Sequence, residues 1–197
     1  ASQLQPLLPK GSIVLHTAGS VPLSVLSTLF GEQSGVLYPL YSFVVGEKIP
    51  WGSFPIFWEG HVQVYEWALR LVGKAEQVQK ASSEERLRLH IGAVFTANFL
   101  NALFHIGGQL AAPVGSWRTF LPLAEGILQR LKTYPPAEAQ TGPARRGDTP
   151  TLQTHIGYLQ NHAPHLLPIY KELTEYIQQH ITPQGSSGRT RLSPQAY

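Results

Sequence analysis

The segment from Leu89 to Gly108 is the longest apolar stretch of the chain, and it limits the folds that the sequence can adopt. Ser82 and Glu85 form a capping-box pattern shortly before it, which predicts that a helix begins there. At about 100° per residue, the apolar side chains of this helix spread over most of its circumference. A helix that is apolar nearly all round is normally buried, so we expect other parts of the protein to surround it.

Four polar side chains interrupt this apolar helix and fall within roughly 80° of arc. They are His90, Asn98, Asn101 and His105. A buried polar group needs a hydrogen-bond partner, because an unpaired amide costs about 1–3 kcal/mol. The stripe therefore faces a ligand, another polar surface or a partner subunit, or else it consists of histidines and amides that are satisfied inside the core. The sequence leaves these interpretations open.

Composition limits the class of protein. The chain has 197 residues, of which 43% are hydrophobic and 14% are charged, so it can form a substantial core but has few charges for its surface. The net charge of +3 is small, and several basic residues lie in one loop and in the tail, which argues against nucleic-acid binding. Without cysteine there is no disulfide or thiolate chemistry. We find no run of about 18 apolar residues and no signal peptide, and we expect a cytoplasmic protein without a membrane span.

The first 81 residues predict an α/β layer, because strand and helix patterns alternate along them. Strands are expected at 12–16, 35–38, 54–59 and 74–79, and Pro55 favours an edge position for the third. Helices are expected at 23–30 and 61–72, and Gly73 ends the second.

From residue 82 onward the pattern is helical. After the apolar helix, which ends near Gly108 or a few residues later, further helices are expected at 119–132, 149–161 and 166–181. The prolines and glycines of residues 133–150 predict a long loop without regular structure, and such loops are usually functional or disordered. The tail, 183–197, is rich in Gly, Ser and Arg and is predicted to be disordered.

Two loops carry residue types that suit a binding site. The first consists of His16, Thr17, Ala18, Gly19 and Ser20, directly after a strand, and ligands of open α/β sheets bind beyond the carboxyl ends of strands. The second contains Gln140, Thr141, Gly142, Arg145 and Arg146, just before a helix start. Its arginines suit a carboxylate or phosphate, to which the helix start adds N–H donors. The alternative for this loop is a surface turn in which an arginine pairs with Asp148 or Glu138.

The common signatures of cofactor and metal sites are absent from the sequence. It contains no GxGxxG, GxxxxGK[ST], GxSxG, HExxH or CxxC pattern. His155, His162 and His165 lie close together in sequence but without a standard zinc spacing, so we expect no metal.

Several motifs follow one another in an order that resembles a known family. In order they are HTAGSVPLSVL, GVLYPLYSF, FPIFWEG, SSEERLRLHIGAVFTANFLNAL, QTGPARRGD and IYKELTEYI, between about Gly11 and Ile181. Together they resemble the Rossmann-like proteins with a DUF2520 C-terminal domain. Those proteins are related to NADP-dependent oxidoreductases such as pyrroline-5-carboxylate reductase and ketopantoate reductase.

The resemblance implies a fold and a domain organisation. The fold is an α/β remnant of a Rossmann-type sheet, followed by an all-α C-terminal domain resembling that of 6-phosphogluconate dehydrogenase. Residues 1–81 would be the C-terminal part of the nucleotide-binding domain, and residues 82–182 a helical domain for dimerisation and substrate binding. Family members begin with a βαβ unit that carries a glycine-rich phosphate loop. This chain has no methionine and starts after that unit, so we expect NADP or NAD to bind only when the missing unit is present.

The resemblance also implies roles for the site residues. Residues 16–20 would lie on the cofactor side of a cleft, and Asn98 and Asn101 on a helix that carries substrate-binding groups. Related reductases often have a lysine one turn before such an asparagine, whereas this chain has Val94, so a lysine proton donor does not carry over. His90 or His105 could take the acid role, since imidazole titrates near neutral pH. Arg145 or Arg146 would bind the substrate carboxylate.

Together these observations predict a cytoplasmic homodimer that transfers a hydride from NADP or NAD to a small oxo or imino acid, with a ketopantoate-like oxo acid as the first candidate. The alternative is a non-catalytic dimerisation or ligand-sensing module that keeps the fold. A closed cleft in which Asn98 and Asn101 bond only to protein would favour the alternative.

Overall fold

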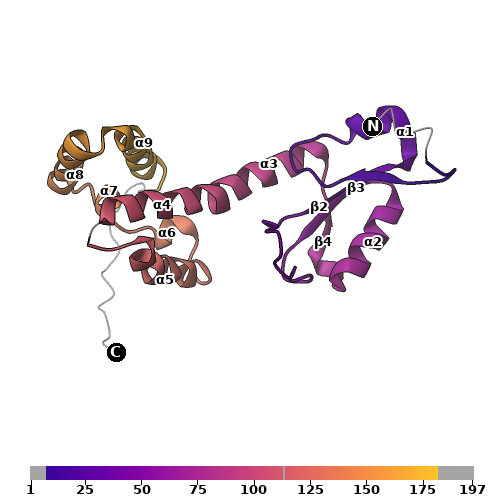
Figure 1. Cartoon of the computed structure of the whole chain (residues 1–197), viewed down its shortest axis with the longest axis horizontal. Helices are drawn as coiled ribbons and strands as arrows, with labels where there is room; N and C mark the ends of the chain where they lie inside the picture. The colour runs from indigo at the N-terminus through magenta and orange to yellow at the C-terminus, as the bar shows by residue number, and fades with distance from the viewer. Residues whose placement is uncertain (1–7, 113, 182–197) are drawn as a thin grey trace, which may run out of the picture. The chain divides into compact units, whose positions relative to one another are not determined.

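The computed structural model describes residues 8–112 and 114–181. The chain forms two compact units that divide between Trp117 and Arg118 (Figure 1). The first unit contains a small sheet and a long helix, and the second is helical. The predicted domain boundary at residue 81 lies between the sheet and the long helix, inside the first unit. It stays a prediction.

The sheet has four strands in the order β1-β2-β3-β4. They are β1 (Val14–His16), β2 (Ser34–Pro39), β3 (Ile56–Gly60) and β4 (Val78–Lys80). β1 runs parallel to β2, β2 antiparallel to β3, and β3 parallel to β4. The expected α/β layer is therefore present, but β3 is an interior strand and its predicted edge position is wrong. Pro55 lies just outside the strand, where its carbonyl accepts a bond from the Leu40 N–H at 3.0 Å.

The remaining expectations for the sheet region are largely confirmed. Helix α1 (Ser24–Phe30) continues into a short 3-10 turn, η2 (Gly31–Gln33), and α2 (Val62–Val72) ends at Gly73 as predicted. The side chain of His61 caps α2 by accepting the Gln63 N–H at 3.0 Å. The predicted strand at 74–79 is only partly correct, because a 3-10 turn, η3 (Ala75–Gln77), precedes β4.

The two faces of the sheet pack against different helices. Leu37 and Ile56 face a core that Val64, Ala68 and Val72 of α2 complete. On the other face, Val36, Tyr38 and Phe57 pack with Ala81 and with Leu89 of the long helix. Neighbouring residues of β2 thus serve opposite faces, as the alternation of a strand requires. Tyr38 is thereby directed toward the long helix.

The long helix runs without a break from Ser83 to Ala111 (Figure 1). It comprises α3 (Ser83–Ala93), a π-helical turn η4 (Val94–Asn98) and α4 (Phe99–Ala111). The capping box of Ser82 and Glu85 at its start is confirmed. The expectation that this helix is buried is wrong, because no residue of α4 is buried and Phe95 is 63% exposed. An apolar pattern shows that a helix needs covering, but it does not show that the same chain provides the cover.

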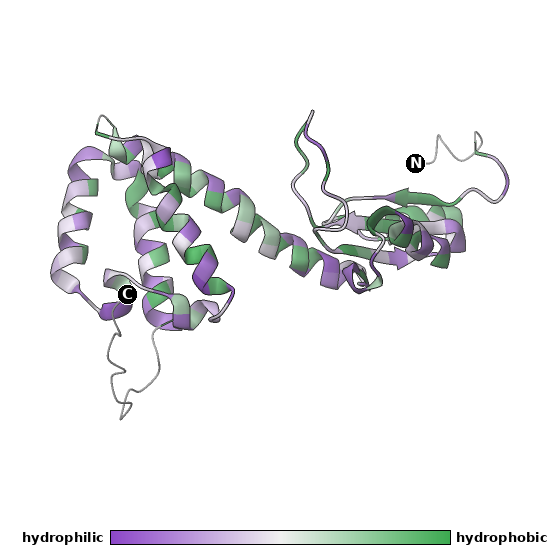
Figure 2. Ribbon diagram, turned by 90° about the horizontal axis from the view of Figure 1, so that it is seen from below, coloured by the Kyte–Doolittle hydropathy of each residue, from purple (hydrophilic) through white to green (hydrophobic). Residues whose placement is uncertain are grey.

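The hydropathy of this helix has a second implication (Figure 2). By length and composition alone, Ser83–Ala111 could cross a membrane, and none of its most apolar window is buried. Length and composition alone are weak evidence for a membrane span. Asn98, Asn101 and His105 interrupt the apolar surface, and polar side chains are costly at the centre of a bilayer.

The second unit consists of short helices. They are η5 (Trp117–Phe120, beginning at the junction), α5 (Leu121–Leu131), α6 (Pro136–Ala139), α7 (Pro143–Arg146), α8 (Thr149–His162), η6 (Pro164–Leu166), α9 (Leu167–Tyr176) and the π-helical turn η7 (Ile177–Ile181). The expectation that 133–150 lacks regular structure is wrong, because α6 and α7 each begin at a proline, which suits the first turn of a helix. Helix α8 begins where it was predicted, and the side chain of Asp148 caps it by accepting the Thr151 N–H. The predicted disordered tail lies outside the described residues.

Candidate functional site

A cleft of about 880 Å³ opens in the first unit where β1 and β2 end. These strands are parallel, so their carboxyl ends lie at the same edge of the sheet. The lining comes from the loop after β1 (Thr17, Gly19), from the end of β2 and the residues that follow (38–43), and from the long helix (Arg88, Leu89, His90, Gly92, Ala93, Val94, Thr96, Ala97, Asn98). Its position and size are those of a ligand site in an open α/β sheet.

Tyr38 and His90 form a hydrogen-bonded pair in this cleft. The Tyr38 hydroxyl lies 3.1 Å from His90 Nδ1, and the rings meet edge to face. Tyr38 is 8% exposed, and burial raises the pKa of its hydroxyl, while the charge of Arg86 opposes the rise. The hydroxyl therefore keeps its proton at neutral pH. The pair joins a strand end to a helix across 52 residues of sequence.

Gly19 makes room for the ring of His90. A Cβ atom at Gly19 would lie 2.7 Å from both Cγ and Nδ1 of His90, and 2.9 Å from its Cβ. Contacts this short force a neighbour to move, and the His90 backbone belongs to a helix that resists movement. Gly19, which was predicted to lie in a binding loop, thus provides the space that the His90 side chain occupies.

We expect Gly19→Ala to displace the His90 ring and to break its bond with Tyr38, because the added methyl group needs the space of the ring. Long-range ¹H–¹⁵N NMR spectra of the imidazole will show the change as altered Nδ1 and Nε2 shifts. Gly92→Ala is the matched control, since its added methyl group meets no atom within 4 Å. Unchanged imidazole shifts in Gly19→Ala would contradict this account of the pair.

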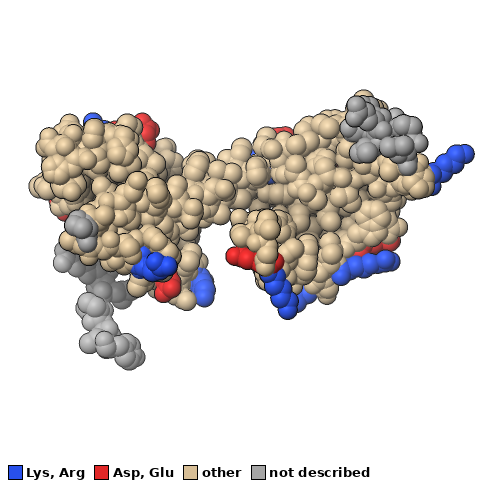
Figure 3. Space-filling model, in the orientation of Figure 1, with Lys and Arg blue, Asp and Glu red and all other residues tan. Residues whose placement is uncertain are grey.

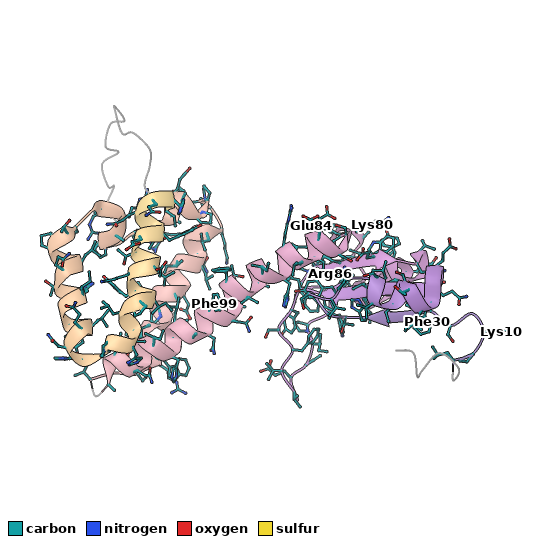
Figure 4. The ribbon with its side chains drawn as sticks, turned by 90° about the horizontal axis from the view of Figure 1, so that it is seen from above. Lys10, Phe30, Lys80, Glu84, Arg86 and Phe99 are labelled. Atoms are coloured by element: carbon teal, nitrogen blue, oxygen red, sulfur yellow. The ribbon has the colours of Figure 1, made fainter. Side chains whose placement is uncertain are left out.

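Arg86 joins elements that carry lining residues of the cleft, although it is not itself in the lining, and it was missed by sequence reasoning. It is 1% exposed and donates from Nη1 to Glu59 at 2.5 Å. It also donates from Nη2 to the Val21 carbonyl at 2.5 Å and from Nε to the Ala18 carbonyl at 3.3 Å. Figure 4 labels Arg86 near the start of the long helix, beside the sheet. One side chain thereby ties α3 to β3 and to the loop after β1.

Ser83 extends this network. Its hydroxyl donates to Glu59 at 2.8 Å and accepts the Leu23 N–H at 3.0 Å. The motif containing Ser83 and Arg86 is read from sequence as a polar helix start, and an arginine in that setting is usually exposed. Its partner Glu59 is 27 residues away, so no local spacing indicates the pair.

The loop predicted to bind cofactor is only partly in the cleft. Thr17 and Gly19 line it, whereas His16, Ala18 and Ser20 are not among the lining residues. His16 Nδ1 accepts the Ala18 N–H at 3.3 Å, and His16 Nε2 is buried without a partner among the described residues. Burial, and then the charge of Arg86, lower the pKa of His16. The role of His16 in cofactor binding stays a prediction.

The polar stripe of the long helix is divided by the structure. His90 and Asn98 line the cleft, whereas Asn101 and His105 lie farther along the helix and outside the lining. Asn98 ends the π-helical turn η4, in which the Thr96 hydroxyl donates to the Gly92 carbonyl at 2.9 Å. π-helical turns occur frequently at functional sites. The Thr96 hydroxyl competes with the regular helical hydrogen bonds, because it bonds to a backbone carbonyl.

The second predicted loop lies in the other unit and forms mainly local contacts. Arg145 donates to the carbonyls of Glu138, at 2.8 Å, and Gln140. Arg146 lies 3.7 Å from Asp148, whose pKa is lowered chiefly by hydrogen bonds from Thr151. Gln140 donates to the Thr141 carbonyl, and Gly142 has a positive φ of 102°. Carboxylate binding by Arg145 or Arg146 stays a prediction.

No group of three or more His, Asp or Glu side chains in the described ranges could hold a metal ion. His155 instead contacts the Tyr170 hydroxyl at 2.8 Å.

The sequence model of DUF2520, a domain of unknown function, matches residues 54–177. The chain belongs to the DUF2520 family. The matched region includes His90, Asn98 and both loop arginines, whereas Tyr38 and the loop after β1 precede it. The family assignment agrees with the motifs that suggested it.

Two solved structures resemble this DUF2520 protein. Putative NADP oxidoreductase BF3122 from Bacteroides fragilis matches with a TM-score of 0.74 and 29% identity, over 84% of this chain and 64% of that one. Protein TM1727 from Thermotoga maritima matches with a TM-score of 0.68 and 19% identity, over 86% of this chain and 68% of that one, and so shows the fold alone. The chain thus spans less than two thirds of BF3122. No curated protein matches the sequence.

Proposed function

We propose that this DUF2520 protein is an NAD(P)-dependent oxidoreductase that transfers a hydride to the carbonyl or imine carbon of an oxo or imino acid. The observation that carries the proposal is the Tyr38–His90 pair inside a cleft at the carboxyl ends of parallel strands. The oxidoreductase-like fold shared with BF3122 supports it. We assign orientation of the reacting group to Asn98 and Asn101. The carboxylate-binding role of Arg145 or Arg146, which lie in the other unit, stays a prediction of the sequence.

The cleft suits the nicotinamide end of the cofactor better than the diphosphate end. Thr17 and Gly19 offer a small-residue edge, and Leu40 and Leu89 offer apolar surface on which a planar ring could lie. The sequence holds no glycine-rich loop of the kind that binds a pyrophosphate. When bound, NADP or NAD supplies the hydride.

His90 is the proton donor in this proposal, and Tyr38 positions it. A carbonyl that accepts a hydride must gain a proton on its oxygen. The Nε2–H of a protonated His90 can supply it while Nδ1–H donates to the Tyr38 oxygen. After transfer, the neutral ring keeps its proton on Nδ1 and still donates it to the Tyr38 oxygen, because a phenol oxygen can accept as well as donate. Tyr38 therefore keeps the imidazole oriented in both states.

The alternative is a ligand-sensing or dimerisation module without chemistry. Asn98 and Asn101 have no side-chain hydrogen bond to other described residues, and the cleft is open, so the structure lacks the feature that would favour this alternative. The two functions differ in one respect that can be measured, which is whether loss of His90 abolishes hydride transfer or only changes ligand affinity.

We propose that a second copy of the chain covers α4. Phe99, Leu100, Leu103 and Leu110 are all exposed along α4, and Phe95 is exposed in the π-helical turn η4 just before it. Little charge is visible along the helix on the face that Figure 3 shows. Obligate interfaces resemble a domain core cut in half, and this apolar surface has that character. A cytoplasmic location stays part of the proposal.

Phe99→Asp is expected to convert the dimer to a monomer, because it places a charge in the apolar interface. Light scattering at micromolar concentration measures the change. Val45→Asp, at a fully exposed loop position, is the matched control and should leave the dimer intact. A monomeric parent protein would contradict the proposal. Co-sedimentation of the parent protein with lipid vesicles would also contradict it if Phe99→Asp abolished that binding, because the apolar helix would then bind a membrane.

A further inference from the structure

We infer that the substrate carries a bulky apolar substituent, of about the size of an aromatic ring, which lies against a wall formed by Tyr41 and Phe43. This inference rests on the proposed function and names its substrate class. It selects oxo or imino acids with a large apolar side chain over those with a short or polar one.

The wall belongs to the segment between β2 and β3, which stands out from the sheet (Figure 2). Tyr41 stacks on Phe54 with ring centroids 4.6 Å apart and an interplanar angle of 23°. Phe54 is buried in the core of the sheet, so it holds Tyr41 in place. Trp51 contacts Phe54 from the same segment, with centroids 5.5 Å apart. The wall is therefore an ordered aromatic cluster rather than a loose loop.

Phe43 forms the open part of this wall. Its ring meets Tyr41 edge to face at 5.3 Å and lines the cleft, yet it is 50% exposed. A phenyl ring left half in water gains from contact with an apolar ligand. The ring contacts Tyr41 and Trp51, and half of its surface stays exposed and available to a ligand.

The long helix supplies a second wall of the cleft. Its apolar lining residues are Leu89, Ala93, Val94 and Ala97, and His90, Thr96 and Asn98 line the cleft from the same helix. The lining contains no acidic residue, and its one charged side chain, Arg88, is 75% exposed and pairs with Glu84 at 2.6 Å. A short polar substituent would leave both apolar walls in contact with water.

The reacting group and the wall are within reach of one molecule. Tyr41 follows Tyr38 by three residues. Their Cα atoms are therefore at most about 11 Å apart, which is the reach of three residues of fully extended chain. A substrate whose carbonyl lies at the Tyr38–His90 pair can therefore place a substituent of aromatic size between the two walls. The volume of about 880 Å³ accommodates such a substrate beside a nicotinamide ring.

The test uses phenylpyruvate and pyruvate as probes, which share the 2-oxo acid group and differ in the substituent. Binding to the full-length protein is measured by calorimetry, and reduction is measured separately with NADPH. We expect phenylpyruvate to bind at least about tenfold more tightly than pyruvate. We expect Phe43→Ala to remove most of that preference. Val45→Ala, in the same loop but outside the cleft lining, should retain it.

The two readouts separate the possible failures. Equal binding of the probes, binding of neither, or an unchanged preference in Phe43→Ala would overturn the substrate class. A preference that Phe43→Ala removes supports the wall even if no NADPH is consumed, and that result would overturn only the hydride-transfer function. Phe43 is half exposed, so thermal unfolding should show that Phe43→Ala folds like the parent protein.

Discussion

Replacing Arg86 by Met is expected to lower the free energy of unfolding by about 3–5 kcal/mol. Arg86 is 1% exposed, and its removal leaves the Glu59 carboxylate, 17% exposed, without its cation. The carbonyls of Ala18 and Val21 lose their donors at the same time. Methionine refills part of the volume but cannot donate a hydrogen bond, so the loss should exceed that of most surface substitutions.

Arg88→Met is the matched control, because Arg88 lies in the same helix and pairs with Glu84 on an exposed surface. Its effect should stay below about 0.5 kcal/mol. Urea unfolding followed by circular dichroism measures both variants. Equal effects for the two variants would show that the buried pair contributes no more than an exposed one.

His16 offers an independent check of the same cluster. The charge of Arg86 helps to lower the pKa of His16, so Arg86→Met should raise that pKa toward its ordinary value of 6.5, while the larger effect of burial remains. In the parent protein the unfolded state binds more protons than the folded state just below pH 6.5, so His16 makes stability fall as the pH drops through that range. Histidine NMR titrations of both proteins measure the shift.

His90→Gln is expected to lower kcat/KM by about 10²- to 10⁴-fold, which is the usual contribution of a positioned general acid. Tyr38→Phe should give a smaller loss, since it removes the hydroxyl that orients the imidazole but leaves the imidazole itself. The double variant should be little worse than His90→Gln, because Tyr38 acts through His90. A double variant whose loss is the product of the two single losses would contradict this division of roles.

His105→Gln is the control for His90→Gln. It makes the same change on the same helix, at a position outside the cleft lining. The comparison gives a readout that general misfolding of the helix would not imitate, since kcat/KM should fall in His90→Gln and not in His105→Gln. A large loss of kcat/KM in His105→Gln would move the acid role to that histidine, which the sequence left open.

The sequence predicted those elements whose signals are local. The capping box at Ser82, the helix ended by Gly73 and the approximate positions of the four strands along the chain follow from short-range patterns. The short helices at 136–139 and 143–146 were missed, because prolines were treated as breakers although each opens a helical turn. The interior position of β3 was missed, because Pro55 lies one residue before the strand.

The site was predictable only in part, for a different reason. His90, Asn98, Thr17 and Gly19 were identified from a helical stripe and from a loop after a strand. Tyr38 was interpreted only as part of a strand, because its link to His90 is a tertiary contact that no spacing encodes. Exposure of the long helix was also unpredictable, since periodicity reveals an apolar surface without revealing what covers it.

The most direct test of the proposed function follows the hydride itself. The full-length protein is incubated with NADPH carrying deuterium at the transferable position and with phenylpyruvate, and the product is analysed by mass spectrometry. We expect deuterium at the former carbonyl carbon, formed about 10²- to 10⁴-fold more slowly by His90→Gln and at the parent rate by His105→Gln. A product without deuterium, while phenylpyruvate binds in the cleft, would contradict hydride transfer and favour a ligand-sensing module.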